Sequence, residues 1–193
     1  MRKLWTSARN LVAMWAAEPS RGPAGEVSGS AFDFEFSGID GTPLKLDTFR
    51  GKALLIVNTA SFCGYTKQYA GLQELWTRYA PRGLVVIGVP SNDFGAQEPG
   101  SEGEIREFCQ RSFAVTFPMT AKQHVIGPAR HPFYAWAADV ISPGAVPRWN
   151  FHKYLVGRDG GLLRSFSTKV PPDSPELEAW IGKALAGPAD IQD

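Results

Sequence analysis

The sequence predicts a single α/β domain in which helices flank a mixed central sheet and a β-hairpin precedes it. Two continuous apolar runs, 53–60 and 84–90, are typical of strands buried on both faces, and a helical pattern lies between them. A strand, a helix and a second strand in succession form a parallel crossover unit, which predicts the centre of the sheet. Asp-Gly pairs between apolar segments predict a hairpin near each end of the domain.

The first hairpin opens the domain. The segments "AFDFEF", from Ala31, and "LKLDTF", from Leu44, alternate apolar and polar residues, and the Asp40-Gly41 turn signal lies between them. The helix between the two buried strands covers about 67–80, because its large apolar residues recur at helical spacing.

The second half of the chain adds helices and a second hairpin. Ser101 and Glu104 form an S-x-x-E capping box that predicts the start of a helix, and another helix is expected over 131–141. The segments "RWNFHKYLVG" and "LLRSFS" predict two strands joined by an Asp-Gly turn. A last helix over 175–186 follows Ser174 as its cap. This succession matches a thioredoxin-like fold with an N-terminal β-hairpin extension.

The composition excludes several classes of protein. The 193 residues are 44% hydrophobic and 20% charged with a net charge of +1, which gives no electrostatic case for a nucleic-acid partner. Two cysteines are too few for a disulfide-stapled secreted scaffold, although one reversible bridge fits either redox compartment. No run is long and apolar enough for an integral membrane segment.

Residues 1–30 differ from the rest and form an N-terminal extension. The segment "MRKLWTSARNLVAMWAA" has a basic amphipathic pattern, and the Pro-, Gly- and Ser-rich linker "PSRGPAGEVSGS" follows it. Charged and polar residues interrupt the apolar core that a secretory signal requires, so we expect a cytoplasmic protein, with a targeting segment and export to the periplasm as the alternative. The domain itself spans 31–187, and 188–193 form a tail.

One cysteine stands at the most informative position of the chain. The segment "NTASFCGYTKQY" reads as a strand end, a tight turn and a helix start, where a Cys-x-x-Cys pair would sit, but the second position is Thr66. A helix N-terminus stabilises negative charge, so a Cys63 thiolate there would be reactive. The alternative is that Cys63 is a buried, unreactive cysteine with a structural role only. Without a partner at Thr66, Cys63 favours oxidation to a sulfenic acid that a more distant thiol resolves.

Four segments together resemble the glutathione peroxidase family. They are "NTASFCGYTKQYAGLQELWTRY", "GVPSNDFGAQEPGSEGEIREFC", "FPMTAK" and "RWNFHKYLVGRDG", and the resemblance covers 31–186. It implies a thioredoxin-like fold and the reduction of hydrogen peroxide and organic hydroperoxides, small or lipid, through Cys63 as the peroxidatic cysteine. It also implies an external thiol reductant, thioredoxin or glutathione, and no bound cofactor.

The resemblance places the family's catalytic tetrad on Cys63, Gln97, Trp149 and Asn150. The chemistry of these residue types supports the set, because two amides and an indole N–H supply donors to a thiolate and a departing oxygen without adding an acid. Read singly, Gln97 could be a loop residue, Trp149 a core residue and Asn150 a turn residue.

The resemblance also assigns Cys109 as the resolving cysteine of thioredoxin-dependent members. The alternative is a cysteine that only packs its helix against neighbouring phenylalanines. A bridge to Cys63 needs Cα atoms within about 7 Å, so a larger separation would require the helix to unwind locally. The connection after 131–141 lacks the longer insertion of tetrameric, glutathione-specific members, so we expect a monomer.

Two departures from the family pattern are Ser91 and Asp93. Asp93 is expected to place a negative charge near Cys63, which would disfavour the thiolate or select against anionic reductants. Conversely, Lys67, Arg148 and Lys153 could attract the carboxylates of glutathione.

Rival functions remain at this point. One is a peroxiredoxin-like or thioredoxin-like reductase, and another is a non-catalytic redox sensor or thiol relay on the same fold. A copper-binding module is a third, although His124, His131 and His152 stand singly in the sequence.

Overall fold

The computed structural model describes residues 29–141 and 145–187, so the amphipathic pattern before residue 29 and the tail 188–193 lie outside the described residues. None of the helices in these ranges is long and apolar enough to cross a membrane. The strands are β1 (Glu35–Ser37), β2 (Pro43–Lys45), β3 (Ala53–Thr59), β4 (Leu84–Pro90), β5 (Lys153–Val156) and β6 (Leu162–Phe166), and the helices are α1 (Gln68–Tyr79), α2 (Glu102–Phe113), α3 (Pro132–Ile141) and α4 (Pro175–Ala186).

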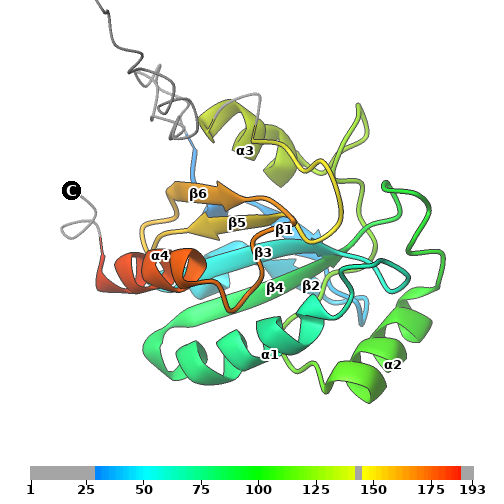
Figure 1. Cartoon of the computed structure of the whole chain (residues 1–193). Coiled ribbons are helices and arrows are strands. Elements are labelled where there is room, and N and C mark those ends of the chain that lie inside the picture. Colours follow the sequence, from blue (N-terminus) through cyan, green and yellow to red (C-terminus); the bar gives the residue numbers. More distant parts are fainter. Residues whose placement is uncertain (1–28, 142–144, 188–193) are drawn as a thin grey trace, which may run out of the picture.

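The central sheet is mixed, as the sequence predicts. Its strand order is β4-β3-β5-β6, with β3 parallel to β4 and antiparallel to β5, and β5 antiparallel to β6. The helices α1 and α4 lie against one face and α3 lies against the other, while the hairpin β1-β2 forms a separate small sheet (Figure 1). The predicted thioredoxin-like fold with an N-terminal hairpin is confirmed.

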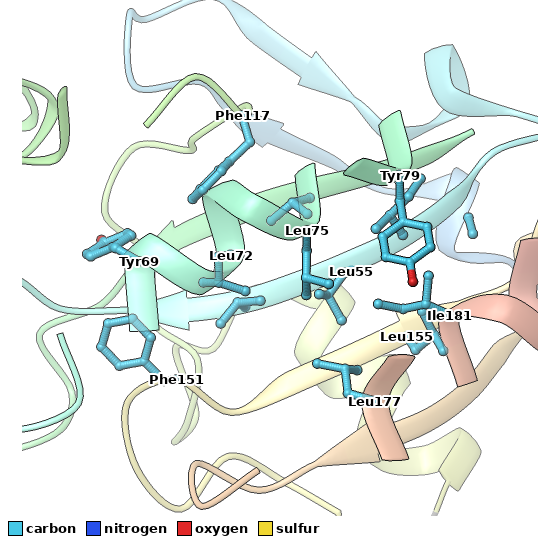
Figure 2. Packing of buried hydrophobic residues seen from close by; sticks show 14 of the residues in the cluster. Leu55, Tyr69, Leu72, Leu75, Tyr79, Phe117, Phe151, Leu155, Leu177 and Ile181 are labelled. Atoms are coloured by element: carbon cyan, nitrogen blue, oxygen red, sulfur yellow. The ribbon is translucent and has the colours of Figure 1, made fainter. Parts of the chain in front are cut away.

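Strand β3 is covered on both faces, which explains its uninterrupted apolar sequence. Leu55 belongs to the core shared with α1 and α4, whereas Leu54 and Ile56 belong to the core shared with α3. Leu72 of α1 and Leu177 of α4 converge on the first of these cores (Figure 2). Each such buried side chain contributes about 1.5–3 kcal/mol to folding, so the site-bearing end of β3 is held rigidly.

The hairpin strands are shorter than the sequence predicts. Ala31–Asp33 and Leu46–Phe49 form 3-10 turns instead of strand ends. The first turn forms because the Ser30 and Asp33 side chains make a capping box, and because Ala31 and Phe32 are buried in succession rather than alternately. The caps predicted for α2 and α4 are confirmed: Ser101 and Glu104 form the capping box, and Ser174 caps α4.

Candidate functional site

Cys63 lies in a turn that the Thr66 side chain holds together. The Thr66 hydroxyl accepts a hydrogen bond from the Cys63 N–H at 3.0 Å and donates one to the Ala60 carbonyl at 2.9 Å. The Thr66 N–H in turn donates to the Cys63 carbonyl at 3.0 Å. Thr66 stands where a Cys-x-x-Cys motif has its second cysteine, and its side chain stabilises the turn. The sequence alone did not indicate this structural role.

The Cys63 thiol is half-buried and free. Its Sγ accepts a hydrogen bond from the Tyr65 N–H at 3.4 Å. Helix α1 begins at Gln68, close to the predicted start at 67, so Cys63 lies in the turn that leads into the helix and not within its first turn. Because the helix dipole acts within the first turn, the group that donates to the sulfur is the Tyr65 amide of the turn rather than the end of the helix.

Gln97 and Asn150 are brought together beside this turn. The Asn150 side-chain amide donates to Gln97 Oε1 at 3.0 Å, and the Gln97 carbonyl accepts from the Phe62 N–H at 3.0 Å. Since Oε1 accepts from Asn150, the Nε2 group of Gln97 is turned away from Asn150 and can donate elsewhere. The loop that carries Gln97 is thereby tied to the residue that precedes Cys63.

Trp149 and Asn150 are fixed by the end of strand β3. Asn58 donates through its side chain to the Trp149 carbonyl at 3.1 Å and accepts through its carbonyl from the Phe151 N–H at 2.6 Å. Thr168 donates to the Asn150 carbonyl at 2.7 Å. These contacts hold Phe151 at a φ of 65°, an uncommon value for a bulky residue, and so set the direction of the two preceding side chains.

Gln97 and Trp149 flank Gly95, which has a φ of 66°. A Cβ atom at Gly95 would lie 3.6 Å from both the Gln97 and the Trp149 side chains. Trp149 also packs against Phe94, with ring centroids 5.9 Å apart, yet 38% of its surface is exposed. The structure therefore brings Gln97, Trp149 and Asn150 to one place next to the Cys63 turn.

A pocket of about 620 Å³ opens beside Trp149. Tyr65 and Trp149 line it on the side of the turn, and Arg148 and Lys169 add two cationic side chains. Tyr65 and Trp149, with the 67%-exposed Phe62 next to Cys63, make up the large exposed hydrophobic residues of the described chain. The surroundings of the thiol are thus open and partly apolar.

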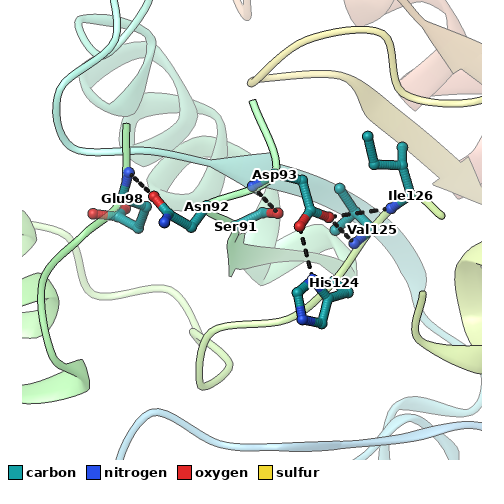
Figure 3. A network of polar contacts seen from close by, with 7 residues as sticks. All are labelled: Ser91, Asn92, Asp93, Glu98, His124, Val125 and Ile126. Atoms are coloured by element: carbon teal, nitrogen blue, oxygen red, sulfur yellow. Dashed lines mark hydrogen bonds and ion pairs between the residues drawn. The ribbon is translucent and has the colours of Figure 1, made fainter. Parts of the chain in front are cut away.

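Asp93 does not direct its charge toward Cys63. Its carboxylate accepts hydrogen bonds from the Val125 and Ile126 amides at 2.7 and 3.2 Å and pairs with His124 at 2.8 Å (Figure 3). Burial alone would raise the pKa of Asp93, but these hydrogen bonds outweigh it and lower that pKa. The expectation that Asp93 acts on the thiol is therefore corrected: its role is to hold the loop at His124.

Lys153 is buried rather than available to a ligand. Its ammonium donates to Gln68 Oε1 and to the Phe151 carbonyl, both at 2.8 Å, and its surface is fully covered. Burial lowers the pKa of Lys153 to about 7. The expectation that it attracts glutathione is wrong; it ties the start of α1 to the segment after Asn150.

His152 is one of three histidines that the copper-binding alternative would use. Burial, reinforced by the charge of Lys153, lowers the pKa of His152 to about 4. Within residues 29–141 and 145–187, no group of His, Cys, Asp and Glu side chains could hold a metal ion, so the described structure offers no support for the copper-binding alternative.

Cys109 is fully buried in α2 and is a free thiol, so no disulfide joins it to Cys63. Burial raises the pKa of Cys109 to about 11, although a contact with the Tyr69 hydroxyl works in the opposite direction. The residues before the two cysteines do meet, because the rings of Phe62 and Phe108 stack with centroids 6.4 Å apart.

Comparisons with known proteins agree with this geometry. The glutathione peroxidase family model matches residues 31–138. A hydroperoxy fatty acid reductase, gpx1, of Synechocystis sp. is 43% identical and aligns over 83% of this chain and 98% of its own length. The chain belongs to the glutathione peroxidase family.

Two further similarities bear on the assignment. The thioredoxin/glutathione peroxidase BtuE of Escherichia coli is 40% identical over 77% of this chain and 93% of its own length. The crystal structure of Trgpx in apo form has a TM-score of 0.67 and 30% identity, covering 83% of this chain and 98% of that one. As a member of the glutathione peroxidase family, this protein is a thiol peroxidase that reduces hydroperoxides with an external thiol and no bound cofactor.

The substitution Thr66→Val tests whether the hydrogen bonds of the Thr66 hydroxyl stabilise the Cys63 turn. Loss of the hydroxyl leaves the buried Ala60 carbonyl and the Cys63 amide without their partner, which should cost about 1–3 kcal/mol of unfolding free energy. We expect a slower reaction of Cys63 with peroxide, measured by stopped-flow kinetics, and restoration by Thr66→Ser. An unchanged rate and stability in Thr66→Val would contradict this role.

The buried Lys153 predicts a distinctive pH dependence of stability. Its pKa is about 7 in the folded protein against an ordinary 10.5, so the unfolded chain binds more protons between these values. The unfolding free energy should therefore rise with pH across this interval, by up to about 1.4 kcal/mol per pH unit. Urea titrations should show that Lys153→Met removes this rise, and an equally steep rise in the variant would refute the burial of the charge.

Proposed function

We propose that this protein is a two-cysteine peroxidase in which Cys63 attacks the hydroperoxide and Cys109 resolves the oxidised Cys63. The observation that carries the proposal is the convergence of Gln97, Trp149 and Asn150 on the turn that presents the Cys63 thiol. A second free thiol, Cys109, lies in the helix whose Phe108 stacks on Phe62.

The first step oxidises Cys63. Its thiolate attacks the terminal peroxide oxygen, the O–O bond breaks, and the departing RO⁻ takes a proton to leave as an alcohol or as water. The products are a Cys63 sulfenic acid and ROH, so two electrons pass from sulfur to oxygen. The free amide of Gln97 and the indole N–H of Trp149 are donors suited to the negative charge that moves from sulfur to oxygen.

The role of Asn150 is to orient its neighbours. Its buried side-chain amide is committed to Gln97 Oε1, and its carbonyl is committed to Thr168, so it cannot turn freely toward a substrate. Fixing Oε1 as the acceptor fixes Nε2 as the outward donor, which pre-organises the site before peroxide arrives.

Organic hydroperoxides fit the surroundings as well as hydrogen peroxide does. The pocket beside Trp149 has room for an organic group, and Val146 and Tyr65 supply apolar lining. Its volume lies within the range of small-molecule sites. The name of the Synechocystis relative, a hydroperoxy fatty acid reductase, agrees with a lipid hydroperoxide as one substrate.

The second half of the cycle uses a thioredoxin-type protein as reductant. Cys109 forms a disulfide with the Cys63 sulfenic acid and releases water, and a dithiol protein then reduces that bridge. Exposed Phe62 and Tyr65 offer such a partner an apolar surface around Cys63. The same proposal includes a monomer, because the connection after 131–141 lacks the longer insertion of tetrameric, glutathione-specific members.

Steady-state NADPH consumption with cumene hydroperoxide tests this function. We expect turnover with thioredoxin and its reductase, loss of all activity in Cys63→Ser, and loss of thioredoxin-dependent turnover in Cys109→Ser. Gln97→Ala and Trp149→Phe should each slow the peroxide step by roughly a hundredfold, because each removes a donor.

Three other outcomes would point elsewhere. Turnover with glutathione alone would make Cys109 a packing residue. Full activity in Gln97→Ala and Trp149→Phe would favour a reductase of the peroxiredoxin or thioredoxin type. Rapid single oxidation without turnover on either reductant would favour the redox sensor.

A further inference from the structure

The pocket beside Trp149 combines apolar and cationic lining residues. Tyr65, Val146 and Trp149 supply apolar surface, and Arg148 and Lys169 supply two positive charges. None of the described residues that line the pocket is an aspartate or a glutamate. Its volume of about 620 Å³ has room for a small molecule with both a polar and an apolar part. The pocket therefore suits an amphipathic ligand whose charge is negative.

The backbone segments that carry the two cations are tied together. The Thr168 hydroxyl donates to the Asn150 carbonyl at 2.7 Å, which joins the turn of Lys169 to the segment of Arg148. The Thr168 carbonyl accepts a hydrogen bond from the Gln68 side-chain amide at 2.8 Å, which joins the same turn to the start of α1. Both cationic residues thus have fixed backbone positions around one pocket, while both remain exposed.

Neither cation has an acidic partner within residues 29–141 and 145–187. The ion pairs in these ranges use other side chains, and Arg148 and Lys169 take part in none of them. Clefts lined by one sign of charge concentrate ligands of the opposite sign. Two unpaired cations in a pocket without acidic residues therefore favour an anionic group on the ligand.

His152 gives a second, independent indication of a polar ligand group. It lines the same pocket, 6% of its surface is exposed, and its Nε2 has no hydrogen-bond partner among the described residues. Buried polar atoms are nearly always paired, so an unpaired nitrogen here fits a pocket that receives a polar group. Because burial lowers the pKa of His152 to about 4, the ring is neutral at physiological pH and leaves the charge of the pocket to the two cations.

The pocket borders the reacting sulfur. Tyr65 lines the pocket, and its backbone amide donates to Cys63 Sγ at 3.4 Å. Trp149, whose indole is a donor for the peroxide-reducing step, lines the pocket as well. A molecule with one end in the pocket can therefore extend along these two aromatic residues to the thiol.

We propose that Arg148 and Lys169 bind the carboxylate of a hydroperoxy fatty acid, so that the enzyme prefers free acids to their esters. The inference deepens the proposed function, because it names the substrate class of the same site. The carboxylate contacts the two cations, the apolar chain lies along Tyr65 and Trp149, and the hydroperoxide group reaches Cys63. Glutathione shares the carboxylate chemistry, but it has no long apolar chain to cover the aromatic residues.

The size of the preference follows from the exposure of the two cations. An exposed ion pair contributes modestly, so each cation should favour the acid over the ester by about threefold, and the two together by about tenfold. The preference should fall as ionic strength rises, because salt screens exposed charges. A preference that came from packing of the chain alone would not respond to salt in this way.

Stopped-flow oxidation of the reduced full chain tests the proposal. The protein is mixed with linoleic acid hydroperoxide, with its methyl ester or with cumene hydroperoxide, the lipids below their micelle concentrations, and the second-order rate constant of Cys63 oxidation is measured. We expect an acid-to-ester ratio of about ten in the wild type, about three in Arg148→Gln and in Lys169→Gln, and about one in the double variant. Arg148→Lys keeps the charge and should retain most of the wild-type ratio.

Lys67→Gln is the matched control. Lys67 is an exposed cation close to Cys63 in the sequence, but it is not among the residues that line the pocket, so the wild-type ratio should persist. A ratio of about one in the wild type, or a ratio of about ten in the double variant, would overturn this inference alone. The same holds if the double variant keeps its ratio and loses turnover with glutathione, since the cations would then serve the reductant. Absence of Cys63 oxidation by all three hydroperoxides would overturn the proposed function as well.

Discussion

The burial of strand β3 on both faces is the constraint on which the site depends. All seven residues of β3 are buried, and the strand lies between β4 and β5 at the centre of the sheet. The carboxyl end of β3 is therefore fixed in position. Asn58 lies at that end and forms hydrogen bonds with the backbone of Trp149 and Phe151. The Cys63 turn follows directly, so the thiol and its neighbouring donors share one rigid support.

Two charged side chains that the sequence suggests near the thiol, Asp93 and Lys153, are held by other partners. Asp93 is occupied by His124 and two amides, and Lys153 is enclosed by Gln68 and the Phe151 carbonyl. The Tyr65 amide donates to the Cys63 sulfur, and the side chain of Gln97 and the indole of Trp149 are neutral donors beside the Cys63 turn. A site of this kind can favour a thiolate and a leaving oxyanion without offering an acid to quench the sulfur.

The fold and the order of its elements could be predicted from the sequence, because apolar runs, capping boxes and Asp-Gly turns are local signals. The sequence predicts hairpin strands that are too long. The Ala31 N–H donates to the carbonyl of Gly160, which is distant in the sequence, and no local pattern reveals such a contact. Asp93 and Lys153 could not be placed, because the direction and burial of a charged side chain depend on tertiary packing. A polar Asn58 at the end of an apolar run was a signal that could have marked the support of Trp149.

We propose that Cys63 and Cys109 act as one redox pair across the stacked Phe62 and Phe108 rings. Peptide mapping of the protein after one equivalent of hydroperoxide, with free thiols alkylated at quench, tests it most directly. We expect a Cys63–Cys109 disulfide as the main product, and we expect it to disappear when reduced thioredoxin is added. Recovery of alkylated Cys109 beside a Cys63 oxidised to sulfenic or sulfinic acid would contradict it.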